Sequence, residues 1–128
     1  MIFHDPINKI HLAGLLAAAD IGMQILTNVP AFYYGTSPNK FFDYIASGLP
    51  VLNNYPGWIA ELITQHQCGI AVPPNNPKVF ADALEHAADN HHILQAMRTN
   101  SLVLAQKQFD RSQLADQWVD CLEKTIIC

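Results

Sequence analysis

Charged residues are scarce in this chain of 128 residues. They make up 14% of the sequence, and 11 acidic against 7 basic side chains leave a formal net charge of −4. Binding to a nucleic-acid backbone needs a basic face, so this composition argues against a general nucleic-acid-binding protein. Hydrophobic residues, in contrast, make up 50%, which is typical of a folded globular chain rather than of a disordered one.

Long apolar runs and targeting signals are also missing. The longest nearly apolar stretch, LAGLLAAADIGMQIL, has about 15 residues and contains Asp20, which is short of the roughly 20 residues that cross a bilayer. The opening stretch, MIFHDPINK, carries Asp5 early and has neither a basic region nor a cleavage-like motif. We therefore expect a cytoplasmic protein without a secretory signal.

Cysteine is rare and follows no ligand pattern. Cys68, Cys121 and Cys128 are an odd number without metal-ligand spacing, which fits free thiols in a reducing compartment. The histidines also lack such spacing, since His91 and His92 are adjacent and cannot share one face of a helix. We expect no metal site.

The apolar pattern predicts strands that alternate with helices. Short strands are expected at 21–26, 50–53 and 70–72, and the initial MIFH is either a fourth strand or an irregular start. Because these runs are apolar throughout, they indicate a parallel sheet that is covered by helices on both faces. We expect one domain, 1–128, with a Rossmann-like α/β fold, a thin sheet of four short strands and a helical C-terminal tail.

Local signals place the ends of several helices. Asn8 is expected to cap a helix that runs to about Ala19, with leucines on one face. A later helix follows Pro56 and Gly57, and Gly69 is expected at the position just after its end. Three further helices are expected at 78–89, 91–107 and 112–126, with Pro77 in the first turn of the first and Asp110 or Ser112 as the cap of the last.

The stretch TSPNKFFDYIASGLP carries the strongest chemical signal. Ser37 is a favoured N-cap and Pro38 suits the first helical position, so a helix is expected over 39–47, ended by Gly48. Its N-terminus follows a strand and therefore lies at the carboxyl edge of the sheet, where ligands of open α/β sheets bind. Free N–H groups and the helix dipole favour an anion there, and Lys40 is the one Lys or Arg between Ile10 and Pro77.

Asp43 lies one turn beyond Asn39 and Lys40. A carboxylate at this place repels a phosphate, but it can accept two hydroxyl hydrogens from a ribose. A phosphate at the cap and a ribose on Asp43 together make a nucleotide site. The alternative is an ordinary helix start in which Asp43 pairs with Lys40, and the spacing alone leaves both interpretations open.

Five segments follow one another in an order that resembles the C-terminal domain of GT-B retaining glycosyltransferases of family 4: AADIGMQI, GTSPNKFFDYIASGLPVL, PGWIAELI, CGIAVPPNNPKVFADAL and FDRSQLADQWVDCL. The SPNKFFDY run is similar to the bacterial subgroup that builds lipopolysaccharide O-antigen and capsule. The resemblance implies a nucleotide-sugar donor as substrate, a lipid-linked or saccharide acceptor, no cofactor and no metal. It also implies that the intact enzyme works at the cytoplasmic face of the membrane.

The resemblance also implies roles for particular residues. Asp43 resembles the second acid of the family's paired-acid element and would hold the donor ribose, whereas the first acid falls at Gly35, which leaves the sugar unspecified. Gly57 and Glu61 match a turn and an acid that lie beside the donor. The implied diphosphate-binding residues are Thr36, Ser37, Asn39 and Lys40.

The same resemblance leads us to expect a C-terminal fragment of a transferase. The acceptor-binding domain and the basic residues that grip the diphosphate would precede this chain, so we expect weak nucleotide binding, no turnover and no assignable catalytic residue. One alternative is a non-catalytic nucleotide-binding module that completes a site with a partner chain or associates with itself through an uncovered sheet edge. Another is a flavodoxin-like phosphate-binding domain, but the sequence lacks the Gly-rich or acidic loop that it needs.

Overall fold

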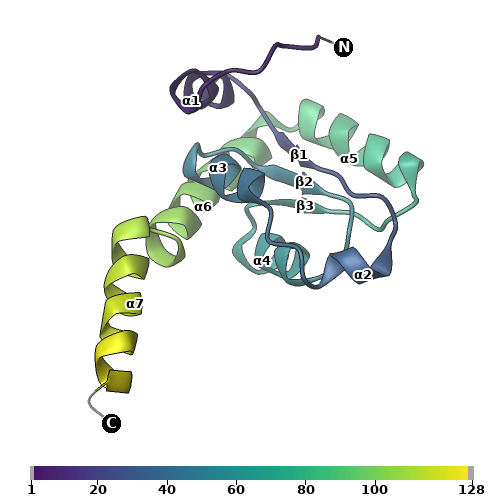
Figure 1. Cartoon of the computed structure of the whole chain (residues 1–128). Coiled ribbons are helices and arrows are strands. Elements are labelled where there is room, and N and C mark those ends of the chain that lie inside the picture. Colours follow the sequence, from purple (N-terminus) through teal and green to yellow (C-terminus); the bar gives the residue numbers. More distant parts are fainter. Residues whose placement is uncertain (1, 127–128) are drawn as a thin grey trace.

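The computed structural model describes residues 2–126, so Cys128 lies outside the described residues. Helices alternate with strands and then continue without them, which confirms the expected α/β fold with a helical C-terminal stretch (Figure 1). In chain order the elements are α1 (Lys9–Ala17), β1 (Gly22–Gln24), α2 (Pro30–Tyr33), α3 (Asn39–Ala46), β2 (Val51–Asn53), α4 (Trp58–His66), β3 (Gly69–Ala71), α5 (Pro77–Asp89), α6 (His91–Gln108) and α7 (Arg111–Ile126).

The sheet is parallel, in the order β1-β2-β3, with Met23, Leu52 and Ile70 side by side. The expectation of four strands is wrong, because residues 2–8 form no regular element. The side chains of Ile2 and Phe3 are 82% and 87% exposed, so they do not pack into the sheet. All three carboxyl ends lie at the same edge, next to α2 on the right of Figure 1.

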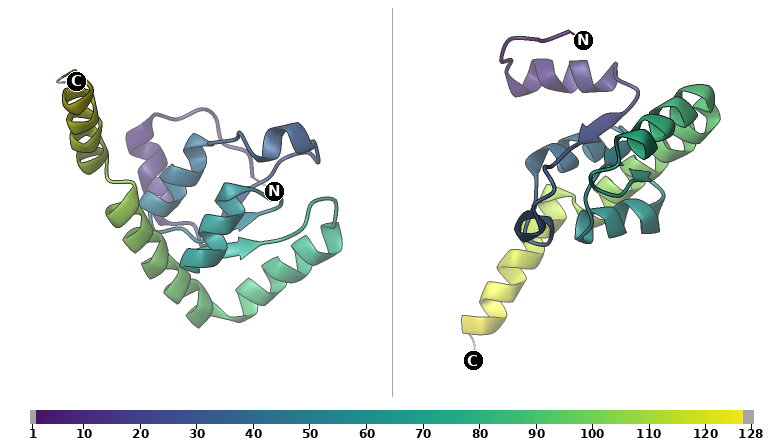
Figure 2. Two further views of the ribbon diagram at one scale, coloured as in Figure 1. Left: turned by 90° about the horizontal axis from the view of Figure 1, so that it is seen from below. Right: turned by 90° about the vertical axis from the view of Figure 1, so that its right-hand side faces the viewer.

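Helices cover both faces of this sheet. Figure 2 shows α3 and α4 on one face and α5 on the other. The α3 side is tight at Gly22, since a Cβ atom there would lie 2.6 Å from the ring of Tyr44. The residues of the core cluster with no more than 1% exposure are Phe41, Ile45, Val51, Tyr55, Ile59, Ile63 and Cys68. Burying each Val, Ile or Phe side chain among them contributes about 1.5–3 kcal/mol relative to leaving it exposed.

One helix end agrees with the sequence-based expectation, and one differs. Gly48 ends α3 in the left-handed region (φ +69°), and Leu49 N–H donates to Tyr44 O over 2.9 Å, as predicted for this position. In α4, however, the left-handed residue is Gln67 (φ 50°) rather than Gly69. Gly69 lies in β3, where a Cβ atom would be 2.0 Å from Val51 O, so glycine is needed for strand packing.

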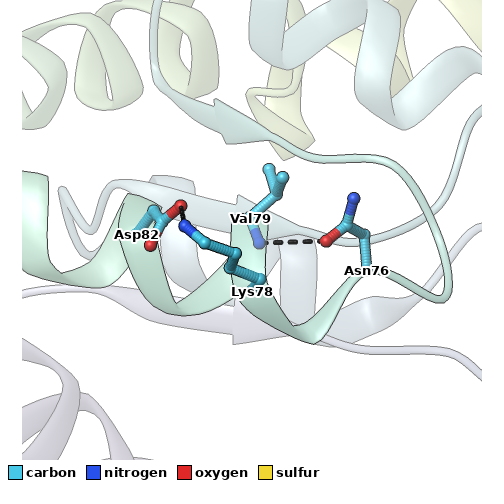
Figure 3. A network of polar contacts seen from close by, with 4 residues as sticks. All are labelled: Asn76, Lys78, Val79 and Asp82. Atoms are coloured by element: carbon cyan, nitrogen blue, oxygen red, sulfur yellow. Dashed lines mark hydrogen bonds and ion pairs between the residues drawn. The ribbon is translucent and has the colours of Figure 1, made fainter.

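The outer helices are less firmly attached. Asn8 caps α1 as expected, its side chain accepting from His11 N at 3.0 Å, but no residue of α1 is buried, so the predicted leucine face stays half-covered. Figure 3 shows the start of α5, where Asn76 caps through Val79 N at 3.1 Å and Lys78 pairs with Asp82. The last helix, α7, begins after an Asp110 cap, has no buried residue and runs away from the sheet (Figure 1).

Candidate functional site

The N-terminus of α3 is reached from the carboxyl end of β1 through α2 and the loop 34–38. The N-cap is Pro38 rather than Ser37, with φ −77° and ψ 126°, and no side chain caps this end. The extended ψ angle keeps Pro38 outside the helix, which begins at Asn39 as expected. Phe41 N–H donates to Pro38 O over 3.0 Å, whereas no hydrogen bond from the N–H groups of Asn39 and Lys40 is found among the residues described, so these two groups are open at the helix end.

The loop before α3 is anchored on the start of α4. Trp58 Nε1 donates to Thr36 O over 2.9 Å, and the Thr36 hydroxyl donates to Phe32 O. Gly57 has φ 118°, and a Cβ atom there would lie 2.7 Å from Tyr33 O. Glycine at position 57 therefore allows α2 to approach α4, and together these contacts place Gly57 beside the loop that leads into α3.

Asp43 faces α1 and not the first turn of its own helix. Its Oδ1 atom lies 3.5 Å from Lys9 Nζ, so the alternative pairing of Asp43 with Lys40 is wrong. Within residues 2–126, Lys40 is exposed and makes no ion pair. Because it has no such partner, Lys40 remains available to an anion at the end of α3.

Tyr44 is adjacent to Asp43. Burial, with a smaller effect of the Asp43 carboxylate, raises the pKa of Tyr44.

A groove of about 310 Å³ separates α1 from α3. Asp43 stands on one wall with Ser47 one turn further along, and the opposite wall combines Lys9 with half-buried leucines. The lining residues are Lys9, Leu12, Ala13, Leu16, Asp43, Ala46 and Ser47. This groove offers a carboxylate, an ammonium group and a hydroxyl against an apolar wall, which suits an uncharged polar ligand group such as a sugar ring.

Glu61 lies apart from the groove that contains Asp43. It is exposed in the first turn of α4, and with Gly57 it lines a second hollow of about 390 Å³. The structure thus brings Gly57 to the loop before α3, because Trp58 binds Thr36, but it places Glu61 on the outer side of α4. No ion pair of Glu61 is found among the residues described.

A cavity at the carboxyl edge was missed by the sequence reasoning. It measures about 320 Å³ and is lined by residues that follow all three strands: Ile25, Asn54, Pro73, Asn75, Asn76, Pro77 and Phe80. The Asn54 amide is already engaged, because its Oδ1 accepts from Leu26 N at 2.8 Å and its Nδ2 donates to Leu26 O over 3.0 Å. The available signal was the PPNNP turn directly after a strand, at the edge where α/β ligands bind.

Two polar side chains are buried where β1 and β2 end. Gln24 and Asn53 are both 0% exposed and lie side by side in the sheet register. Gln24 Nε2 donates to Tyr55 OH over 2.9 Å, and Asn53 Nδ2 donates to Tyr55 O over 2.5 Å. Burial raises the pKa of Tyr55, partly offset by this bond to Gln24. These bonds fix the strand ends from which the site loops start.

Two kinds of feature are absent from the described part of the chain. Across residues 2–126, no three His, Cys, Asp or Glu side chains are grouped so that they could hold a metal ion. None of the helices in that range has both the length and the apolar character needed to cross a membrane.

Comparison with known proteins gives one family. A family model described as glycosyl transferases group 1 matches residues 1–90, which is more than half of the chain. It spans α1 to α5 and includes the loop 34–38, α3 and the start of α4. Neither a curated protein nor a solved structure gives a significant match.

Proposed function

The chain belongs to the group 1 glycosyl transferases, and from this premise we propose that it binds the nucleotide-sugar donor of a sugar-transfer reaction. The observation that carries the proposal is the N-terminus of α3, which has no side-chain cap, next to Lys40, which makes no ion pair within residues 2–126, and with Asp43 one turn further along. Such a helix end attracts anions, because its first N–H groups lack intrahelical partners and the helix dipole places a partial positive charge there.

The proposed diphosphate site consists of Thr36, Ser37, Asn39 and Lys40, with Gly35 and Gly57 beside it. When the bond from sugar to diphosphate breaks, negative charge develops on the leaving diphosphate. Preorganised N–H groups and an ammonium group stabilise that charge more in the transition state than in the ground state. In this part of the reaction, the proposed role of the N-terminus of α3 is to bind and orient the donor.

Asp43 is proposed to hold the ribose. A carboxylate accepts two hydroxyl hydrogens at once, and the vicinal hydroxyls of a ribose match this geometry.

Retention of the anomeric configuration and a role in bacterial lipopolysaccharide or capsule synthesis are also proposed, on the resemblance of SPNKFFDY to that subgroup. Glu61 is proposed as a neighbour of the donor, on resemblance alone. The acceptor is proposed to be lipid-linked or a saccharide.

The open edge of the sheet supports a second candidate, a nucleotide-binding module completed by another chain. Among the residues described, β1 pairs with β2 alone, and Met23 and Ile25 at this edge are 45% and 49% exposed. An exposed edge strand is a template for pairing, so this candidate predicts a dimer in which β1 is buried. Light scattering with chromatography tests it, and Met23→Lys should then return the chain to a monomer.

The donor-binding proposal is tested by NMR titration of the full chain with UDP, GDP and pyrophosphate. The backbone amides of Thr36, Ser37, Asn39 and Lys40 should shift with all three compounds, and those around Asp43 should shift only with the nucleotides. Asp43→Asn should weaken nucleotide binding by about tenfold, the effect of one good charge-assisted hydrogen bond. Asp82→Asn is the matched control, since Asp82 is also an exposed, lysine-paired helix acid. A folded chain that binds none of the three compounds contradicts the proposal.

A further inference from the structure

The ion pair of Lys9 and Asp43 joins two helices that are distant in the sequence. Lys9 Nζ lies 3.5 Å from Asp43 Oδ1 across a separation of 34 residues. Over residues 2–126 this is the one side-chain hydrogen bond that links α1 to another element. The Lys9 side chain is 81% exposed, and exposed ion pairs add little to stability. The placement of this pair at the candidate site therefore calls for a functional reason.

The site has an electrostatic problem that this pair solves. Asp43 lies one turn from the end of α3, where a diphosphate is proposed to bind, and an uncompensated carboxylate there repels the anion. Lys40 cannot serve both groups, because a lysine engaged with Asp43 is lost to the phosphates. Lys9 reaches Asp43 from α1 instead and leaves Lys40 unpaired within the described chain.

The pair also leaves part of the carboxylate open. Lys9 contacts Oδ1, and no hydrogen bond to Oδ2 of Asp43 is found among the residues described. A carboxylate has about four lone-pair sites, so a ribose can bind while Lys9 stays in place. The groove of about 310 Å³ beside the pair gives room for it.

We propose that Lys9 is a positioning residue of the donor site, which neutralises Asp43 so that this acid holds a ribose without repelling the diphosphate. The inference rests on the proposed function and deepens it. It assigns one lysine to each charged group: Lys9 to the acid and Lys40 to the diphosphate. It also gives α1 a role, since α1 carries the compensating charge.

The test is a double-mutant cycle on the full chain, read by calorimetry or NMR with UDP, GDP, uridine and pyrophosphate. Lys9→Ala should weaken the binding of the diphosphates by about threefold to tenfold and leave the binding of uridine unchanged. Lys9→Arg should restore the binding of the diphosphates. In an Asp43→Asn background, Lys9→Ala should have no further effect, because no charge is left to neutralise. Lys78→Ala is the matched control, since Lys78 is an 83% exposed lysine that pairs with Asp82 on α5 (Figure 3) and does not line the groove.

The outcomes separate this inference from the function on which it rests. If the wild-type chain binds UDP or GDP and Lys9→Ala binds them equally well, the role of Lys9 is overturned while the proposed function stands. If Lys9→Ala is equally harmful with and without Asp43, its effect does not pass through that acid and the inference also fails. A wild-type chain that binds no probe overturns both.

Discussion

The Oγ atom of Ser101 lies 3.0 Å from Leu49 O and 3.3 Å from Cys68 O. Leu49 leads into β2 and Cys68 into β3, so one buried hydroxyl of α6 contacts the amino ends of two neighbouring strands. Helix α6 is thereby joined to the edge of the sheet that lies opposite the candidate site. The site loops at the carboxyl edge are free of this constraint.

Ser101→Ala should lower the free energy of unfolding by about 1–2 kcal/mol, because Leu49 O is left buried without this donor. Cys68 O keeps its bond from Val51 N at 3.1 Å, so the loss concerns mainly one carbonyl. Urea unfolding followed by circular dichroism measures the change. Thr99→Ala in the same helix is the control, as Thr99 is exposed, and an equal effect of both variants would argue against the role of Ser101.

Gly69→Ala should destabilise the chain by at least about 3 kcal/mol or prevent folding, a size reserved for severe packing defects. The new Cβ atom would lie 2.0 Å from Val51 O, and the backbone of β2 cannot move without breaking the sheet. Gly14→Ala is the opposite case, since nothing lies within 4 Å of that position and alanine favours a helix by about 0.5–1 kcal/mol. Denaturation curves of both variants measure the free energies of unfolding. A small loss of stability in Gly69→Ala would contradict the strand geometry.

The sequence was sufficient for most of the order of elements, because the signals involved are local, but it did not predict the short helix α2 or exclude a fourth strand. Alternating apolar runs and turns predict strands and helices. The role of Gly48 as the residue that ends α3 is predictable from the helical pattern directly before it. The reason for Gly69 is not local, because it lies in the neighbouring strand. The N-cap at Pro38 instead of Ser37 differs by one residue, within the usual uncertainty of helix ends.

The candidate site was predictable in part for the same reason. The positions of Asn39 and Lys40 at the N-terminus of α3 were predictable, because the local sequence marks the start of a helix that follows a strand. The partner of Asp43 does not, since a rule for residues three apart favours Lys40, whereas the structure pairs Asp43 with Lys9, which is 34 residues away. The carboxyl-edge cavity likewise combines residues from three separate loops, so no single stretch could reveal it.

The two described cysteines should differ in reactivity. Burial, slightly offset by a backbone hydrogen bond, raises the pKa of Cys68 from 9.0 to about 11, whereas Cys121 is exposed. Because the thiolate is the reactive form, iodoacetamide at pH 8 should modify Cys121 and spare Cys68 until the chain is unfolded. Peptide mapping by mass spectrometry measures both sites, and rapid modification of native Cys68 would contradict its burial.

The same shift predicts how stability depends on pH. The folded state holds the Cys68 proton more tightly than the unfolded state, so this contribution to stability is complete below pH 9 and lost between about pH 9 and 11. The maximum slope is about 1.4 kcal/mol per pH unit. Unfolding curves of the wild type and of Cys68→Ala between pH 8 and 10.5 isolate it, and parallel curves would refute the prediction.

Trp58→Phe should loosen the loop that leads into α3. Trp58 Nε1 donates to Thr36 O over 2.9 Å, and a phenyl ring keeps much of the contact with Phe42 but lacks the N–H group. The expected loss is about 1 kcal/mol in the free energy of unfolding, with faster amide exchange over residues 34–38. Trp118→Phe is the control, because Trp118 is 65% exposed on α7 and its replacement should stay within about 0.5 kcal/mol. If exchange over 34–38 is unchanged in Trp58→Phe, the indole does not hold this loop, and the preorganisation of the α3 end must come from Gly57 and α2 instead.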